Sequence, residues 1–243
     1  MRIALVSDIH GNWVAFEAIL RDIQKQRIDS LVCLGDVATL GPQPLPVIAK
    51  LQSLECLCVI GNHDAALFDA DNAHKFQIAP SLVPSVQWAA EQLTPQDFAF
   101  LRGFKPTVEI ALAPDVNLLC FHGSPQSYTD MILATTPADE LDRMLEPHTA
   151  LIFAGGHTHV QMLRQSKGRL VINAGSVGSP FRQSFVPNTQ PELLPWAEYA
   201  ILESSNGITS VDLRRIPFDI KAFCRIAAAS TLPMRDWWLE QYG

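Results

Sequence analysis

The sequence predicts an α/β fold with a mixed sheet, and two observations predict it. Short apolar runs alternate with segments whose apolar residues recur at helical spacing, a pattern typical of α/β domains. In the second half of the chain, apolar runs also occur in pairs joined by turn residues, which indicates hairpins. The 243 residues are enough for one large domain, and no linker-like stretch divides them. We therefore expect a single domain over residues 1–243.

The first half of the chain alternates between predicted strands and helices. Short apolar runs predict strands over residues 3–6, 31–34 and 57–60. Helical spacing predicts helices over residues 13–23 and around residues 47–51, and a helical segment over residues 64–101. Asn12 is placed to cap the first helix, and Thr94 followed by Pro95 marks a fresh helix start within the long segment.

Paired runs dominate the second half. They predict strands over residues 108–112, 116–121, 151–154, 162–165 and 170–172, and a further hairpin over residues 199–213. Turn residues separate the members of the pairs at 113–115, 166–168 and 205–207. Thr136 and Pro137 open a helix whose first turn contains Asp139 and Glu140, where acidic side chains are favourable. Hairpins beside parallel strands predict a mixed sheet.

Five of the apolar runs end in residues that can bind a divalent metal ion. In chain order these are Asp8 and His10, Asp36, Asn62 with His63 and Asp64, His122, and His157 with His159. Side chains that follow buried strands converge in the crevice at the carboxyl ends of the strands, where open α/β sheets bind ligands. The pattern therefore predicts a two-metal hydrolase.

The spacing and charge of these residues suit a shared site. Residues two positions apart on an extended chain point the same way, so Asp8 and His10 can face one cleft. His157 and His159 can do the same. Two ions about 3.5 to 4 Å apart need a shared ligand, and Asp36, central in the motif order, is the best candidate for that bridging carboxylate. Asn62 offers a neutral oxygen, so the loaded site would stay cationic and favour a phosphoester over a neutral amide.

Each motif also has a simpler interpretation. A single Asp or His after a strand is commonly a helix cap or a surface residue, and Asp64 can cap a helix that begins at Ala65. Five such motifs in one order are hard to explain as caps. His74 and His148 lie in polar surroundings without a partner nearby in the sequence, and we interpret both as surface residues.

Composition and charge exclude several classes of protein. The formal net charge of -7 argues against a nucleic-acid-binding surface, which needs a basic stripe. No apolar run approaches the roughly 20 residues that span a bilayer. The chain enters a core strand directly after Met1 and Arg2, which leaves no room for a signal peptide. An odd set of cysteines, mostly within apolar runs, indicates reduced thiols in the cytoplasm: Cys33, Cys56, Cys58, Cys120 and Cys224.

Taken together, the motifs resemble those of the calcineurin-like metallophosphoesterase superfamily. Two longer segments, Ser7–Asn12 and Asn173–Gly178, are similar to its small bacterial and archaeal phosphodiesterase branch. The resemblance covers residues 1–180 and leaves the predicted strands and helices of residues 196–243 outside it.

The resemblance implies a fold, a metal centre and an activity. The fold is a four-layer α/β/β/α sandwich, in which two mixed β-sheets pack face to face with helices outside. One ion would be held by Asp8, His10, Asp36 and His159, and the other by Asp36, Asn62, His122 and His157. A hydroxide between the ions would attack the phosphoester, while His63 would contact the phosphate and protonate the leaving oxygen.

Two departures distinguish this chain from other branches of that superfamily. Branches with a purple di-iron centre have a tyrosine ligand three residues after the bridging aspartate, where this chain has Thr39. Protein phosphatases and dinucleoside tetraphosphatases have an Asp-Arg pair in the same loop. In this chain the loop, residues 37–42, contains no such pair. Both departures favour a phosphodiesterase. The alternatives are a phosphomonoesterase, including a nucleotide or protein phosphatase, and a non-catalytic scaffold that uses the fold.

Several features stay open at this point. The ligand types suit manganese, iron, zinc, cobalt or nickel, and neither the substrate nor the oligomeric state follows from the sequence. Arg182 is either a phosphate contact or a solvated loop residue, and Tyr128 either lines the pocket or packs in a turn. Trp237 and Trp238 either dock a final helix onto the domain or form an oligomer contact.

Overall fold

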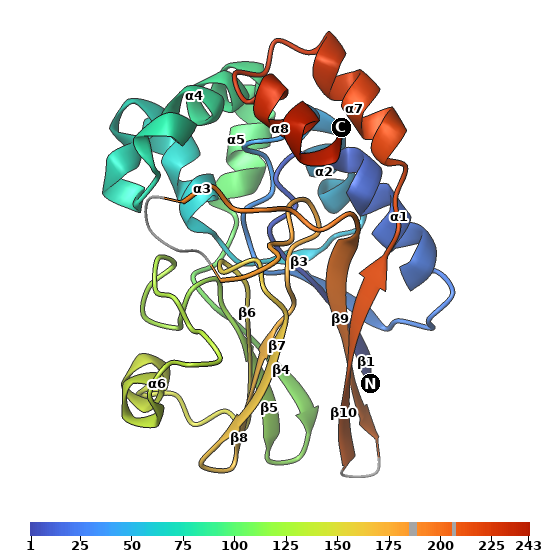
Figure 1. Cartoon of the computed structure of the whole chain (residues 1–243). Helices are drawn as coiled ribbons and strands as arrows, with labels where there is room; N and C mark the ends of the chain where they lie inside the picture. Colours follow the sequence, from blue (N-terminus) through green and yellow to red (C-terminus); the bar gives the residue numbers. More distant parts are fainter. Residues whose placement is uncertain (185–188, 206–207) are drawn as a thin grey trace.

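Two five-stranded sheets form the centre of the molecule (Figure 1). The computed structural model describes residues 1–184, 189–205 and 208–243. The first sheet has the order β10 (Ile208–Ile216), β9 (Ala197–Ser205), β1 (Arg2–Val6), β2 (Ser30–Cys33) and β3 (Leu57–Cys58). The second has the order β4 (Val108–Ala113), β5 (Val116–Cys120), β6 (Ile152–Gly155), β8 (Arg169–Asn173) and β7 (Met162–Ser166).

Both sheets are mixed, as predicted. In the first sheet β1 runs parallel to β2 and antiparallel to β9. In the second, β6 is parallel to both β5 and β8, whereas the edge strands β4 and β7 are antiparallel to their neighbours. The predicted hairpins therefore form the antiparallel parts. The turn of the last one, at Asn206 and Gly207, lies outside the described residues.

Strand β1 shows how alternate residues build two cores. Ile3 and Leu5 point between the sheets, where they pack in a cluster with Ile152 of the second sheet. Ala4 and Val6 point the other way, into a cluster with the helices. These four side chains of β1 are fully buried. A run of apolar residues without polar alternation is expected when both faces of a strand are covered.

Helices cover the outer face of each sheet. The α-helices of the described residues are α1 (Trp13–Ile23), α2 (Pro44–Ser53), α3 (Asn62–Ala66), α4 (Val83–Gln92), α5 (Pro95–Arg102), α6 (Ala138–Leu145), α7 (Ile220–Ala229) and α8 (Arg235–Tyr242). Residues of α1 and α2 pack on the first sheet, and Leu141 and Leu145 of α6 pack on the second. Figure 1 shows α1 and α6 on opposite sides of the two sheets, so the predicted four-layer sandwich is confirmed. None of the helices in the described ranges has the length and apolar character needed to cross a membrane.

The long helical segment is divided into shorter pieces. After α3 come two 3₁₀ helices, η1 (Leu67–Phe76) and η2 (Pro80–Leu82), and then α4 and α5. Prolines stand in the first turns of η2, α4 and α5, where the missing N–H costs nothing but continuation from the preceding helix is blocked. The predicted start at Thr94 is confirmed, because its hydroxyl accepts from Asp97 N. Asn12 likewise caps α1 by accepting from Ala15 N at 3.0 Å.

Strand β3 is shorter than predicted. The sequence predicts a strand over residues 57–60, but the ladder with β2 covers only Leu57 and Cys58. Beyond it the chain changes partner, since Val59 forms a single bridge with Lys105 and Ile60 N donates to Lys105 O. The change of partner releases the chain from the sheet just before Gly61 and Asn62.

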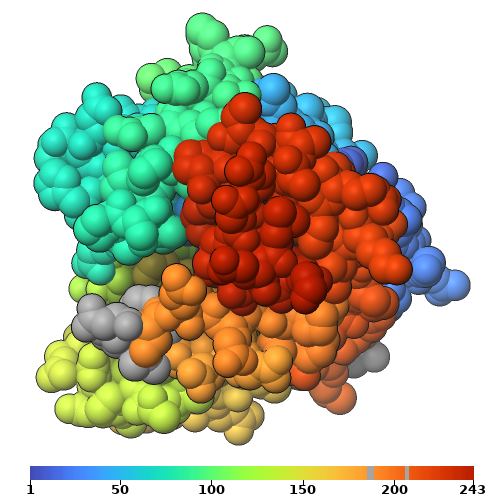
Figure 2. All heavy atoms as spheres, turned by 45° about the horizontal axis from the view of Figure 1, so that its top comes forward, coloured from blue at the N-terminus to red at the C-terminus, as the bar shows by residue number. Residues whose placement is uncertain are grey.

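The C-terminal helices α7 and α8 dock onto the domain. Trp238 is 1% exposed and contacts Phe223 of α7 edge to face, with ring centroids 5.0 Å apart. Its indole Nε1 donates to Leu40 O at 2.7 Å. Trp237 packs against Trp238 and stays partly exposed. The docking interpretation of these tryptophans is therefore confirmed, and Figure 2 shows the two helices (red) as a block between the segment of residues 65–100 and the rest of the C-terminal half.

Candidate metal centre

Loops at the carboxyl ends of five strands meet in one place. The loop after β1 is bonded to the loop after β2, because Asp8 N donates to Gly35 O at 2.9 Å and His10 N donates to Asp36 O at 3.0 Å. The loops after β5 and β6 are joined by Gly156 N, which donates to His122 O at 2.9 Å. The ends of both sheets therefore form one polar cluster, as the crevice argument predicts.

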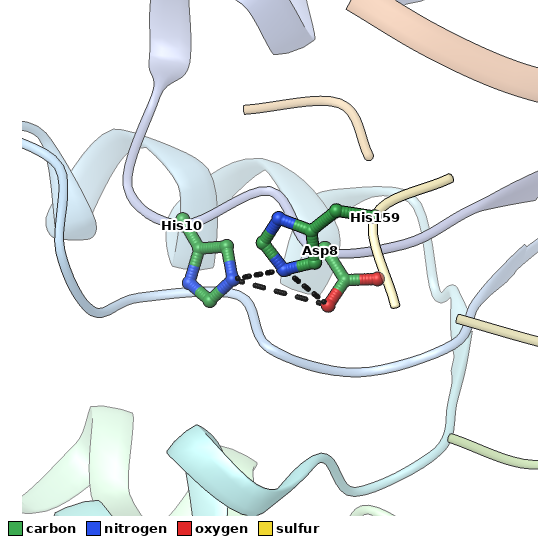
Figure 3. A group of neighbouring side chains, drawn as sticks. All are labelled: Asp8, His10 and His159. Atoms are coloured by element: carbon green, nitrogen blue, oxygen red, sulfur yellow. Dashed lines mark hydrogen bonds and ion pairs between the residues drawn. The ribbon is translucent and has the colours of Figure 1, made fainter. Parts of the chain in front are cut away.

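Asp8, His10 and His159 form the first group of candidate ligands (Figure 3). His159 Nε2 lies 3.1 Å from Asp8 Oδ1 and 3.1 Å from His10 Nε2. His10 Nε2 is 3.8 Å from the same Asp8 oxygen. Figure 3 shows the carboxylate and the two rings converging, with Asp8 and His10 on one loop and His159 on another segment of the chain. Two imidazole nitrogens and one carboxylate oxygen at this spacing are a donor set that suits a divalent transition metal.

A second group comprises Asp36, His122 and His157, and it adjoins the first. His122 Nε2 lies 3.3 Å from Asp36 Oδ2. That same oxygen is 3.9 Å from His10 Nε2 of the first group. Asp8 also faces both groups, since its Oδ1 lies 4.0 Å from His122 Nε2. Asp36 Oδ2 therefore stands between the two groups.

Backbone carbonyls fix the ring orientation of two histidines. His122 Nδ1 lies 2.7 Å from Leu34 O, and His159 Nδ1 lies 2.8 Å from Ser179 O. A carbonyl oxygen only accepts, so both Nδ1 atoms carry a proton and both Nε2 atoms are directed at the cluster. Such outer contacts are typical of histidines that bind metal ions.

Asn62 Oδ1 is buried and has no hydrogen-bond partner among the described residues. The amide is oriented by Phe76 O, which accepts from Asn62 Nδ2 at 3.1 Å and leaves Oδ1 free. A buried acceptor without a partner is costly, so this atom indicates that something else satisfies it. Asp8 Oδ1 and His122 Nε2 face other side chains of the cluster, His159 Nε2 at 3.1 Å and Asp36 Oδ2 at 3.3 Å. Because all three are metal-ligand atom types, the residues fit a divalent metal.

Several of the candidate ligands have a left-handed backbone conformation. A positive φ is found at Asp8 (53°), His10 (48°), Asp36 (59°), His157 (65°) and His159 (56°). A left-handed backbone is uncommon for residues other than glycine and costs about 1 kcal/mol or more per residue. The cost recurs at five of the seven predicted metal ligands, so it marks a functional site.

Two glycines allow the close approach of the loops. A Cβ atom at Gly61 would lie 2.0 Å from Asp36 Oδ1, and one at Gly156 would lie 1.9 Å from Ser7 Oγ and 2.6 Å from Asp8 Oδ2. Any side chain at either position would therefore displace a carboxylate of the cluster.

The acidic and basic groups stabilise each other strongly. Burial opposes the charged form of His122, but the Asp36 carboxylate raises its pKa to about 10. Burial likewise opposes ionisation of Asp8, yet His159 lowers its pKa to about 2. The site therefore attracts positive charge, and protons and metal ions compete for the same nitrogens.

His63 lies beside the two groups and belongs to neither. Its ring stands edge-on to His10 with centroids 5.0 Å apart, and its Nδ1 lies 3.0 Å from Thr39 Oγ1. Its backbone N–H donates to Asp36 Oδ1 at 2.9 Å. Burial lowers the pKa of the His63 imidazole.

Comparison with known proteins agrees with this geometry. The family model of the calcineurin-like phosphoesterase superfamily domain matches residues 1–189. The chain belongs to the calcineurin-like phosphoesterase superfamily.

Other proteins are similar to this one over nearly the whole chain. An uncharacterised protein of Methanocaldococcus jannaschii is 25% identical over 240 residues, which are 97% of this chain and 94% of the relative. A solved metallophosphoesterase from Sphaerobacter thermophilus is 24% identical with a TM-score of 0.76, and the match covers 100% of this chain and 98% of that one. A hypothetical protein from Pyrococcus horikoshii is 18% identical with a TM-score of 0.81, over 99% and 97% of the two chains. These structures share the fold, and membership of the calcineurin-like superfamily implies a metal-dependent hydrolase.

The other sequence interpretations have mixed outcomes. Arg182 is an exposed loop residue, with 60% of its side chain accessible and an ion pair to Glu192 at 2.7 Å. Tyr128 packs beside Phe76 with ring centroids 6.4 Å apart. His74 is exposed, whereas His148 is only partly exposed.

The interpretation of Asp64 as the cap of a helix beginning at Ala65 is wrong. Helix α3 begins at Asn62, and Asp64 lies in its first turn. Its fully buried carboxylate accepts from Asp36 N at 2.7 Å, Val37 N at 2.9 Å and Gly61 N at 3.0 Å. It therefore fastens the loop after β2 to the loop after β3. The sequence contains no signal for this role, because the three donors are backbone groups.

We expect Asp64→Asn to lower the free energy of unfolding by about 1 to 3 kcal/mol, because an amide NH₂ would replace one acceptor oxygen in front of three N–H donors. Urea denaturation with an unchanged slope would measure this loss. Asp71→Asn, at an exposed acid in η1, is the matched control and should change stability by less than about 0.5 kcal/mol. Equal effects of the two substitutions would contradict the fastening role.

Proposed function

We propose that this protein is a two-metal phosphoesterase that prefers phosphodiesters. The observation that carries the proposal is the position of Asp36 Oδ2, which lies 3.3 Å from His122 Nε2 in one ligand group and 3.9 Å from His10 Nε2 in the other. A carboxylate oxygen between two imidazole groups is placed to be shared by two ions.

Each proposed ion has four protein ligands. Asp8, His10, Asp36 and His159 would hold one, and Asp36, Asn62, His122 and His157 would hold the other. When bound, the ions supply a water-derived nucleophile at neutral pH and neutralise charge on the phosphoryl oxygens. Because Asp8 and Asp36 are the two carboxylates of these groups, the loaded site stays cationic and attracts an anionic ester.

His63 is proposed to protonate the leaving oxygen. Its Nδ1 faces Thr39 at 3.0 Å, so Nε2 is the ring nitrogen free to contact a substrate. The buried residue is held at two points: Thr39 contacts its ring, and Asp36 Oδ1 accepts its backbone N–H. A proton donor fixed in this way contributes about 10² to 10⁴ in rate.

Two observations support an enzyme over a scaffold and a diesterase over other esterases. Both groups have a complete set of donors, and all of these residues except His157 are buried, which a docking surface does not require. The loop after Asp36 carries Thr39 and lacks the acid–arginine pair of phosphatases and dinucleoside tetraphosphatases.

The cysteines and the ligand types bear on location and metal identity. Five free cysteines, three of them fully buried or nearly so, support a reducing, cytoplasmic location. The ligand set suits manganese, iron, zinc, cobalt or nickel.

Comparing two esters of one chromophore tests the proposal. With manganese, we expect kcat/KM for bis(4-nitrophenyl) phosphate to exceed that for 4-nitrophenyl phosphate by about tenfold or more, a difference of about 1.4 kcal/mol in transition-state binding. A chelator should abolish both activities, and added manganese should restore them. A preference for the monoester would favour a phosphomonoesterase, and no hydrolysis with any of the five metals would favour a scaffold.

A further inference from the structure

The C-terminal helix α8 contacts the loop that contains the residue beside His63. Trp238 Nε1 donates to Leu40 O at 2.7 Å across 198 positions of sequence, and Trp238 is 1% exposed. The region that matches the superfamily ends at residue 189, so α8 lies outside it. The match to the superfamily therefore does not include the residue that makes this contact.

The contacted loop, Thr39–Gly41, has an unusual and tightly enclosed backbone. Leu40 has a φ of +70° and is 8% exposed. Gly41 packs so closely on the loop after β1 that a Cβ atom there would lie 2.1 Å from His10 O. A left-handed leucine persists only where its surroundings hold it. Trp238 contributes to that restraint, since its indole N–H donates to the Leu40 carbonyl.

The residue before Leu40 is placed between two histidines of the site. The fully buried Thr39 hydroxyl lies 3.0 Å from His63 Nδ1 and 3.4 Å from His10 Nδ1. His10 turns its Nε2 toward the first ligand group. To protonate a leaving oxygen, His63 must be an imidazolium with hydrogen on both ring nitrogens, so its Nδ1–H donates to the Thr39 hydroxyl oxygen. Its Nε2–H then faces away from Thr39 and is the proton that a leaving oxygen can take.

We propose that Trp238 and Thr39 are positioning residues for His63: α8 holds the Thr39–Gly41 loop, and the Thr39 hydroxyl fixes the orientation of the His63 ring. The proposal rests on the function proposed for His63. It assigns to the C-terminal helix a part in catalysis without any contact between α8 and substrate.

Two pairs of matched variants test the contacts. Thr39→Val removes the hydroxyl at nearly constant shape, whereas Thr39→Ser keeps it. Trp238→Phe removes the indole donor, whereas Trp237→Phe makes the same change at the neighbouring, partly exposed position of α8. We expect Thr39→Val to lower kcat by about 10- to 100-fold and Trp238→Phe by roughly tenfold, as is typical when outer contacts of a functional histidine are lost. Thr39→Ser and Trp237→Phe should stay within about twofold of the wild type, all with unchanged metal content.

The dependence of kcat on the leaving group distinguishes a misplaced proton donor from a general structural defect, which would lower kcat equally for all esters. On a series of aryl phosphodiesters, a misplaced proton donor matters more as the leaving phenol becomes a stronger base. Thr39→Val and Trp238→Phe should therefore make the dependence of kcat on phenol pKa steeper, as His63→Ala does. A uniform loss on all esters would show a general packing defect and overturn the proposal.

The Thr39 pair does not depend on α8. If Trp238→Phe fails to fold, the leaving-group dependence of Thr39→Val and Thr39→Ser still decides.

The two proposals fail in different ways. If His63→Ala leaves the leaving-group dependence unchanged, His63 is not the proton donor and the proposed function needs revision. If His63→Ala steepens it while Thr39→Val and Trp238→Phe do not, the role of His63 stands and the positioning role of α8 is refuted.

Discussion

Replacing Asp36 with asparagine is expected to abolish phosphoester hydrolysis and to weaken binding of both metal ions together. Asp36 Oδ1 accepts the backbone N–H of His63 at 2.9 Å, while Oδ2 faces both ligand groups. An asparagine would keep its carbonyl oxygen toward that N–H and so present an NH₂ group, a donor, where the ions need an anionic oxygen. Loss of an outer contact to a metal ligand already costs about 10- to 100-fold, so loss of the shared ligand should exceed about 10³-fold in kcat/KM.

Metal analysis of the purified variant distinguishes the possible roles of Asp36. Elemental analysis should find both ions reduced per chain, together with the loss of activity. Asp115→Asn is the matched control, because Asp115 also has a positive φ, of 63°, but lies in the exposed turn between β4 and β5. A variant with a normal content of both ions would refute the shared position, and loss of one ion alone would assign Asp36 to a single group.

Replacing His63 with alanine is expected to lower kcat by about 10² to 10⁴ while the metal content stays normal. The ring lies outside both ligand groups, so its removal takes away a proton donor and leaves the donor atoms in place. The backbone N–H that Asp36 accepts is retained by alanine. The loss should be larger for esters with strongly basic leaving groups.

Steady-state kinetics and metal analysis on the same sample test this prediction. His74→Ala, at an exposed histidine of the adjacent η1, controls for the loss of an imidazole and should leave kcat unchanged. If an ion is lost from His63→Ala, His63 is itself a ligand and the leaving oxygen must receive its proton from another group.

The fold was predictable from patterns that depend on near neighbours in the sequence. Apolar runs gave the strands, and capping residues such as Asn12 and Thr94 gave helix starts that the structure confirms. The end of β3 was predicted wrongly, because it depends on a change of partner to Lys105, and no local pattern encodes that choice.

The candidate ligands were predictable for a related reason. Each follows a strand, and parallel strands deliver their carboxyl ends to one edge. The roles of Thr39, Asp64 and Trp238 were not predictable, because each acts through a bond to a backbone group or a ring that is distant in sequence. Assignment of the seven residues as ligands stays a prediction until metal is measured.

The positive φ angles at the five predicted ligand residues would couple the folding of this protein to its metal supply. Strained backbone raises the free energy of any chain that has folded without ions, and ion binding would compensate for it. Binding energy spent in this way appears as resistance to unfolding, and it grows with the free concentration of the metal. Newly synthesised copies in a metal-starved cell would therefore be the ones most exposed to proteases, and the abundance of the protein would follow the nutrient status of its host.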